Sequence, residues 1–337
     1  MKIRLLNFAV ILLAVSSGLT IEARAQTRAR NTVTPVPSLM ASLPESDAVA
    51  QVKVKQLLNE AMPRILAGNP AKLAEANASI DRFKERTGLD ARMFQQIALG
   101  VRFTYPSDGV TKAQTVALAN GTFSSAAMVA AGRVASNGKY REEKYRDKTI
   151  YIFTLDENIR LLGVFDVRIT ELAAAPMDTN TLALGNPEGV RAVIDAGRQR
   201  KAANAELIAL ATRDPNAVIG FGANMSEQLV SNLDIGNAPI AADLKTLRQV
   251  YGSVSTTATD LELFLAARAV NAQAARSLGD TLEGLKQFGA LLVGRLSGAK
   301  GVLAKSALAN MKIVTDASEL QIRTTVAQAE VGPLFGN

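Results

Sequence analysis

Apolar residues follow two periods along the chain after residue 45, and these periods predict strands interleaved with helices. Alternation is cleanest from residue 320 to 326, where Leu320, Ile322, Thr324 and Val326 would share one face of a strand. The other segments expected to form strands are 48–54, 97–103, 115–119, 148–153, 164–169, 181–184, 217–221, 261–267 and 311–314.

Helical spacing, bounded by capping residues, predicts the intervening segments. Asn69 is a suitable N-cap, Pro70 fits the first turn, and Gly88 is suited to ending the helix. Pro63 should kink or end a shorter helix that precedes it. The remaining expected helices are 124–134 capped by Ser124 or Ser125, 187–196 capped by Asn186, 241–250, and a long helix after Asn271.

The long helix carries an apolar stripe that we expect to pack in the core. Four glycines recur beside it every five residues, so they do not share one helix face. They are therefore not expected to form a close-packing seam. The stripe comprises Ala274, Leu278, Leu282, Leu285, Phe288 and Leu292, and the glycines are Gly279, Gly284, Gly289 and Gly294.

Interleaving without regular alternation predicts the α+β class, with antiparallel-rich sheets and helices packed on one face. Segments 115–134 and 261–282 both place a strand before an alanine-rich helix, which indicates two ferredoxin-like (split βαβ) pseudo-repeats. The polar stretch 198–206 suggests a boundary between a first unit, 45–200, and a second unit, 201–337. A single composite domain is the alternative.

The N-terminus has the features of a secretory signal peptide over residues 1–25. Lys2 and Arg4 precede an apolar run, and Ala23-Arg24-Ala25 predicts cleavage after Ala25. The run is shorter than the ~20 residues that span a bilayer, which disfavours a retained anchor. Residues 26–44 are expected to be a flexible linker. The mature chain is therefore predicted to be periplasmic or secreted, with no transmembrane span.

Composition excludes several chemistries. The chain contains no histidine and no cysteine, so His-based triads, thiol nucleophiles, disulfides and thiolate metal sites are absent. The formal charge of +7 falls to +5 without the leader. This mild excess is typical of a solvated surface, and we expect no nucleic-acid partner.

The most charged segment, 139–148, contains interleaved tyrosines and both signs of charge. Stacking and charge could serve a single-stranded nucleic acid, but the acidic residues favour a solvated hairpin edge protected against mispairing. Within it, Glu142, Glu143 and Asp147 could act as the carboxylates of a glycosidase. The lack of tryptophan and the few aromatic residues disfavour that hypothesis.

Two further motifs are weak. The strand-to-helix turn 185–189 could present backbone N–H groups to an anion, although Pro187 removes one donor and the same residues are ordinary capping chemistry. Lys305-Ser306 has the composition of a Ser-Lys dyad, but adjacency carries no geometric information. No catalytic, cofactor-binding or metal-binding residue is therefore assigned, and no cofactor is expected.

Three segments resemble a loose group of exported bacterial proteins of unknown function with duplicated α+β units. They are the opening 43–49, the segment 140–153, and 181–195 with its Leu-Gly-Asn-Pro-Glu-Gly turn. The resemblance implies the α+β fold and carries no catalytic residues to transfer.

Taken together, these patterns predict an exported, non-enzymatic protein that acts through binding or as an envelope scaffold. An envelope protein or a small ligand is the expected partner. A carrier for a small or lipidic ligand is the alternative, and a hydrolase that uses carboxylate, serine or lysine comes last.

Overall fold

The computed structural model describes residues 39–87, 90–107, 110–161, 165–199, 204–231 and 238–335, and these residues fold around one antiparallel sheet. The predicted signal peptide lies outside the described residues. The strands are β1 (Ala48–Val52), β2 (Phe94–Ser107), β3 (Val110–Gly121), β4 (Tyr140–Tyr145), β5 (Lys148–Leu161), β6 (Phe165–Pro176), β7 (Thr181–Gly185), β8 (Ala217–Asn224), β9 (Leu247–Thr256), β10 (Asp260–Ala269), β11 (Lys312–Asp316) and β12 (Glu319–Ala327).

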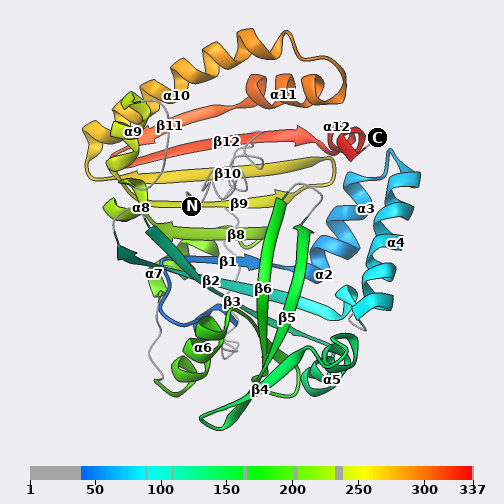
Figure 1. Ribbon diagram of the computed structural model, residues 1–337. Coiled ribbons are helices and arrows are strands. Elements are labelled where there is room, and N and C mark those ends of the chain that lie inside the picture. Colours follow the sequence, from blue (N-terminus) through cyan, green and yellow to red (C-terminus); the bar gives the residue numbers. More distant parts are fainter. Residues whose placement is uncertain are drawn as a thin grey trace, which may run out of the picture.

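The twelve strands lie in the order β11-β12-β10-β9-β8-β1-β2-β3-β7-β6-β5-β4. At the middle of the sheet, Ala50 of β1 lies opposite Leu99 on one side and Phe221 of β8 on the other. The sheet is therefore continuous across the two predicted units. Figure 1 shows it twisting strongly, so that β5 and β6 run steeply across the direction of β8 to β12.

The strand order corrects the ferredoxin-like prediction. In a split βαβ unit, another strand lies between the two strands that a helix connects. Strands β10 and β11 meet this condition, because β12 lies between them. However, β1 and β2 are direct neighbours although helices connect them, and three strands separate β3 from β4. The sheet is thus an open antiparallel sheet rather than a pair of ferredoxin-like sheets.

The helical elements connect consecutive strands at several points and cover the sheet (Figure 1). They are η1 (Leu39–Ser42), α2 (Val54–Gln56), η2 (Leu57–Ala61), α3 (Met62–Ile65), α4 (Pro70–Thr87), η3 (Ala91–Met93), α5 (Ser125–Ala135), α6 (Pro187–Gln199), α7 (Ala205–Ala211), α8 (Glu227–Ser231), α9 (Ala238–Lys245), α10 (Ala272–Val293), α11 (Gly298–Asn310), α12 (Gln328–Val331) and η4 (Gly332–Phe335).

Helices pack on both faces of the sheet, which corrects the prediction of one covered face. Leu118 of β3 belongs to the same buried cluster as Val193 of α6. Its neighbour Ala119 points to the opposite face and packs with Met128 of α5. The small residues of β3 and β6 allow helices to pack closely on both faces of the sheet. The prediction of a single covered face was therefore wrong.

The predicted linker 26–44 also needs a correction at its end. Residues 39–44 are ordered, and Met40 and Leu43 are among the most buried side chains of the described chain. They pack in the same cluster as α6 and α7. Apolar side chains spaced three apart, in a segment otherwise rich in proline and threonine, are the signal for this anchor.

The capping residues confirm four predicted helix starts. The side chain of Ser124 accepts a hydrogen bond from Ala127 N, and Asn271 accepts one from Ala274 N. Asn69 accepts from Lys72 N at 3.2 Å, and Asn186 accepts from Gly189 N at 3.1 Å. Each bond satisfies a backbone donor that has no partner within the helix.

Pro63 falls within a continuous helical run from α2 to α3, and the turn before it, η2, is a π-helix. Proline lacks an N–H, and its ring crowds the carbonyl four residues earlier. Widening the preceding turn relieves that crowding, so the proline distorts the helix without ending it.

The predicted helix 241–250 is wrong beyond Lys245, where α9 ends and β9 begins two residues later. Tyr251 is fully buried, and β9 pairs with β8 and β10 on its two sides. Pairing on both edges, together with the β-branched and aromatic residues of 250–256, outweighs the local helical spacing.

Candidate functional sites

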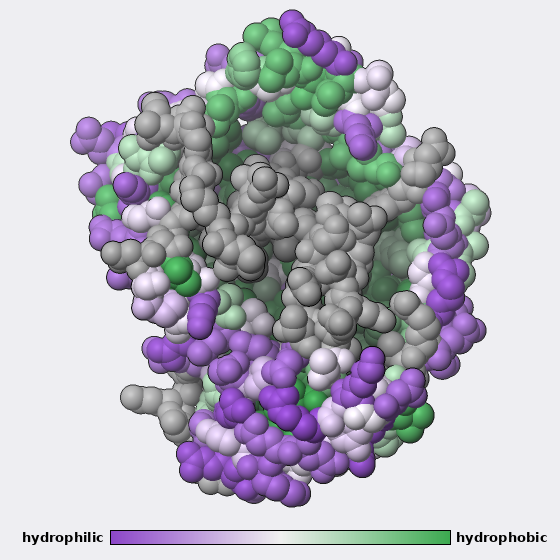
Figure 2. Space-filling model, in the orientation of Figure 1, coloured by the Kyte–Doolittle hydropathy of each residue, from purple (hydrophilic) through white to green (hydrophobic). Residues whose placement is uncertain are grey.

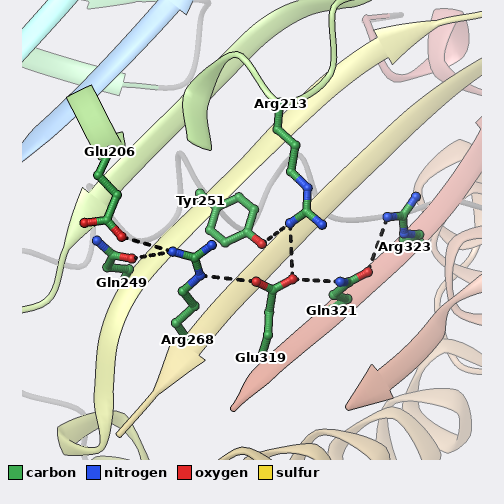
Figure 3. A network of polar contacts seen from close by, with 8 residues as sticks. All are labelled: Glu206, Arg213, Gln249, Tyr251, Arg268, Glu319, Gln321 and Arg323. Atoms are coloured by element: carbon green, nitrogen blue, oxygen red, sulfur yellow. Dashed lines mark hydrogen bonds and ion pairs between the residues drawn. The ribbon is translucent and has the colours of Figure 1, made fainter. Parts of the chain in front are cut away.

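The densest polar network lies where β9, β10 and β12 meet the end of α7 (Figure 3). Glu319 is its centre. Its carboxylate accepts hydrogen bonds from Arg213 Nη1 at 3.1 Å, Arg268 Nε at 3.2 Å and Gln321 Nε2 at 2.7 Å. Arg268 also contacts Glu206 at 3.1 Å, and thereby ties α7 to the sheet.

The arginine side chains of this network pack on aromatic rings. Tyr251 is fully buried, and its hydroxyl hydrogen-bonds Arg213. The guanidinium groups of Arg213 and Arg268 lie 5.4 and 5.6 Å from the centre of the Tyr251 ring, and that of Arg323 lies 4.5 Å from the centre of the Phe264 ring. These distances are typical of cation–π contacts.

The charges in the network are fixed by their surroundings. Burial, followed by a hydrogen bond with Glu319, raises the pKa of Tyr251 to about 12. Burial alone would raise the pKa of Glu319, but hydrogen bonds from Tyr251, Gln321 and the two arginines together lower it to about 2. At neutral pH Glu319 is therefore ionised and Tyr251 is neutral, and neither is poised to transfer a proton, so we interpret the network as a structural clamp.

A second polar feature is a cleft of about 550 Å³ at one end of β1, β2 and β3, beside the π-helix η2. Among the described residues that line it, the charged side chains are those of Lys53, Lys55 and Glu60. The carboxamide side chains that line the cleft are Gln51, Gln56, Asn59, Gln95, Gln96 and Asn120.

These cleft side chains have unused hydrogen-bonding capacity. Within the described residues, none of the six carboxamides and neither Lys55 nor Glu60 makes a side-chain hydrogen bond or ion pair. The Asn120 Oδ1 atom is buried and has no partner there. Lys53 is the exception, since its Nζ donates to the Pro215 carbonyl at 2.6 Å. Most polar side chains of the cleft are thus unpaired within the described residues, whereas those of the clamp are paired with one another.

The local backbone around the cleft is irregular. Asn59 and Glu60 lie on the π-helix, and the register between β2 and β3 shifts between Phe94 and Gln96. The shift leaves Gln95 outside the regular pairing. Both π-helical turns and β-bulges re-aim side chains and often occur at binding sites.

A third feature is an apolar surface on α10 and α11. Leu278 is buried against the sheet in the cluster of Leu247 and Leu320, as the predicted stripe requires. The C-terminal half of the stripe is not core, because Phe288 is 59% exposed and Leu291 beside it is 74% exposed. The exposed apolar residues of this surface are Leu285, Phe288, Leu291, Leu292, Leu296 and Val302.

The position of α10 explains this exposure. In Figure 1, α10 extends along the outer edge of the sheet with α11 beside it, and Leu308 of α11 lies next to Gly289 in the distal half of α10. Figure 2 shows apolar surface gathered at that end of the molecule. Helical spacing in the sequence identifies an apolar stripe, but it does not show how much of that stripe the sheet covers.

The candidate carboxylates from the sequence do not converge. Glu143 forms a bidentate ion pair with Arg191 of α6, whose hydrogen bonds lower the pKa of Glu143. Glu142 lies next to it on β4 and pairs with Arg133 at 3.4 Å, and Asp147 lies in the following turn. Strand β4 is the last strand of the sheet, which confirms the prediction of a charged edge.

The turn 185–189 is occupied by its own chain. Asn186 Oδ1 accepts hydrogen bonds from Gly189 N and Thr115 N, both at 3.1 Å. A Cβ at Gly185 would collide with the Thr115 carbonyl, so the turn is docked against β3. The backbone N–H groups at this helix start are therefore used for capping rather than for binding an anion, as the capping residues in the sequence predicted.

Lys305 and Ser306 are consecutive on α11 and so point about 100° apart around the helix axis. Lys305 is exposed, whereas the Ser306 hydroxyl is half-buried and contacts Asn310 at 3.5 Å. The pair does not form a dyad. Among the described residues, no group of three or more acidic side chains is arranged to hold a metal ion.

The fold and these surfaces define an α+β protein built on an open antiparallel sheet. No protein-family model matches the chain, and no curated protein matches it in sequence. Crystal forms III, IV and I of TP0453 are similar in structure, at 11%, 10% and 9% identity and TM-scores of 0.43, 0.44 and 0.43. Each comparison covers 88% of this chain and 98%, 96% and 97% of TP0453. Similarity at this level transfers neither a site nor a function.

Proposed function

We propose that the protein is an exported, non-enzymatic envelope protein that attaches to an anionic membrane surface through α10 and α11. The observation that carries the proposal is the exposed apolar surface of these helices, centred on Phe288 and Leu291. Isolated exposed apolar residues are ordinary, but a contiguous apolar surface is typical of an interaction site.

The charge around this surface indicates which kind of partner it binds. Residues 284–315 contain five basic residues and no acidic one. Arg295, Lys300 and Lys305 are exposed, and none of them has a carboxylate partner within the described residues. An amphipathic surface that combines Phe and Leu with unpaired Lys and Arg matches the acyl boundary and the headgroups of anionic lipid.

The energetics are adequate for reversible attachment. Complete burial of one Phe or Leu side chain contributes about 1.5–3 kcal/mol, and partial insertion contributes less. Each basic residue close to an anionic surface adds about 1 kcal/mol. No helix of the described chain is long and apolar enough to cross a bilayer, so the proposal concerns attachment at the surface.

Vesicle flotation tests this proposal. The protein should float with vesicles of phosphatidylglycerol and phosphatidylcholine, and less with phosphatidylcholine alone. The double variant Phe288→Ser, Leu291→Ser should reduce flotation on both. Val134→Ser is the matched control, because Val134 is 78% exposed on α5 and lies outside the surface.

Three results would contradict the proposal. Equal flotation of the double variant and the wild type would remove the role of the apolar surface. If the substitutions Lys300→Gln and Lys305→Gln leave flotation unchanged and salt has no effect on it, anionic headgroups do not contribute to attachment. If the helices instead cross-link to one envelope protein in intact cells, that scaffold role replaces membrane attachment.

A further inference from the structure

We propose that the carboxamide-lined cleft binds a short peptide with free ends. The cleft lies among β1, β2, β3 and η2, and no residue of the α10–α11 surface lines it. This inference is therefore independent of membrane attachment, and each can fail without the other.

The hydrogen-bonding groups of the cleft are complementary to those of a peptide. A carboxamide offers donors and an acceptor on one planar group, and a peptide bond offers one donor and one acceptor in the same arrangement. Six carboxamides that have no side-chain partner among the described residues, including Gln51, Gln96 and Asn120, line the cleft. The Asn120 Oδ1 atom is a buried acceptor with no partner among the described residues, and buried polar atoms usually have one.

The charged groups of the cleft suit a ligand that carries both signs of charge. Lys55 and Glu60 both lie at the cleft, exposed and without partners within the described residues. Opposite charges that do not neutralise each other are suited to a zwitterion, with Glu60 near an ammonium and Lys55 near a carboxylate. Lys53 adds positive potential while its Nζ stays bound to the Pro215 carbonyl.

The size and lining of the cleft favour a short peptide over other ligands. A volume of about 550 Å³ lies in the range of small-molecule sites, which favours a few residues with small side chains. Among the described residues no aromatic side chain lines the cleft, which disfavours a sugar. The one carboxylate among these lining residues, Glu60, is too few for a metal ion and disfavours a polyphosphate.

The local backbone holds the groups in place. Gln56, Asn59 and Glu60 are three and four residues apart, so they lie along one side of the helical run. Gln96 lies opposite Asn120 in the β2–β3 pair. The walls of the cleft thus come from three strands and the helical run, and among its described lining residues only Lys53 lies between elements.

Calorimetric titration and saturation-transfer NMR of the purified protein with tri-alanine test the inference. Tri-alanine should bind, and its N-acetylated, C-amidated form should bind about tenfold more weakly, which corresponds to about 1.4 kcal/mol. Glu60→Gln and Lys55→Gln should weaken binding of tri-alanine but not of the capped form. The double variant Gln56→Ala, Gln96→Ala should weaken binding of both.

Gln273→Ala is the matched control, because Gln273 is an exposed glutamine on α10 and does not line the cleft. Thermal melts of each variant verify that folding is intact. The inference is overturned if tri-alanine fails to bind at about 10 mM, a concentration that detects even very weak complexes. It is also overturned if cellobiose binds in its place, or if the control weakens binding as much as the cleft variants.

Discussion

Arg191 and Glu143 form a bidentate ion pair that joins α6 to the edge strand β4, with both N–O distances at 2.7 Å. Both side chains are about one-third exposed. The pair places charge on the last strand of a long antiparallel sheet, where an unpaired row of backbone groups would otherwise invite another strand. It therefore contributes to both stability and solubility.

Glu143→Gln should lower the free energy of unfolding by about 1 kcal/mol, because a half-buried fork of two charge-assisted bonds becomes a neutral contact. Glu142→Gln is the matched control, since its partner Arg133 lies at 3.4 Å and both side chains are 44% exposed. Urea denaturation measures both variants. If the two variants lose equal stability, the fork has no special role.

Local sequence signals predicted much of this architecture. The α+β class, most strand cores and the caps at Asn69, Ser124, Asn186 and Asn271 followed from periodicity and capping chemistry. These features depend on residues within a few positions of one another, which is the range over which such patterns carry information. The strand order depends on contacts between distant segments, and the ferredoxin-like expectation failed there.

The sites were harder to predict for the same reason. The clamp joins Arg213, Tyr251, Arg268 and Glu319, which no short motif connects. Helix α7 contributes Glu206 to the clamp, and it begins within the polar stretch that suggested a boundary between two units. The cleft consists of glutamines and asparagines, residue types with no distinctive spacing, so only the fold reveals that they converge.

Acid should weaken the clamp through Glu319. Its folded-state pKa of about 2 lies below the ordinary value of 4.5, so its contribution is present above pH 4.5 and is lost as pH falls towards 2. Glu319→Gln should cost about 2 kcal/mol at pH 7, because two arginines lose their shared carboxylate. Unfolding measured from pH 7 to pH 2 should therefore show a smaller loss in the variant than in the wild type. Parallel pH profiles would contradict this role.

Close packing of α7 on β8 depends on Gly220. A Cβ at this position would collide with the Ala211 carbonyl, so Gly220→Ala should displace α7 and cost about 1–3 kcal/mol. Gly284→Ala is the matched substitution, because no atom lies within 4 Å of a Cβ there and the residue is inside α10. That variant should gain about 0.5–1 kcal/mol from helix propensity. Thermal melts should thus move in opposite directions, and a shared direction would contradict the packing argument.

Alkali should also weaken the clamp, through Tyr251. Its folded-state pKa of about 12 lies above the ordinary value of 10, so the neutral phenol stabilises the fold fully below pH 10 and progressively less as pH rises towards 12. Tyr251→Phe retains the ring beneath Arg213 and Arg268 and removes the hydroxyl that Arg213 contacts. The variant should lose about 1 kcal/mol at pH 7 and show less additional loss between pH 10 and 12. Absorbance of the tyrosinate, followed together with circular dichroism, separates ionisation of Tyr251 from unfolding. If the wild type loses a tyrosine proton at this position while the fold is intact near pH 10, the buried hydrogen-bonded phenol is not part of the clamp.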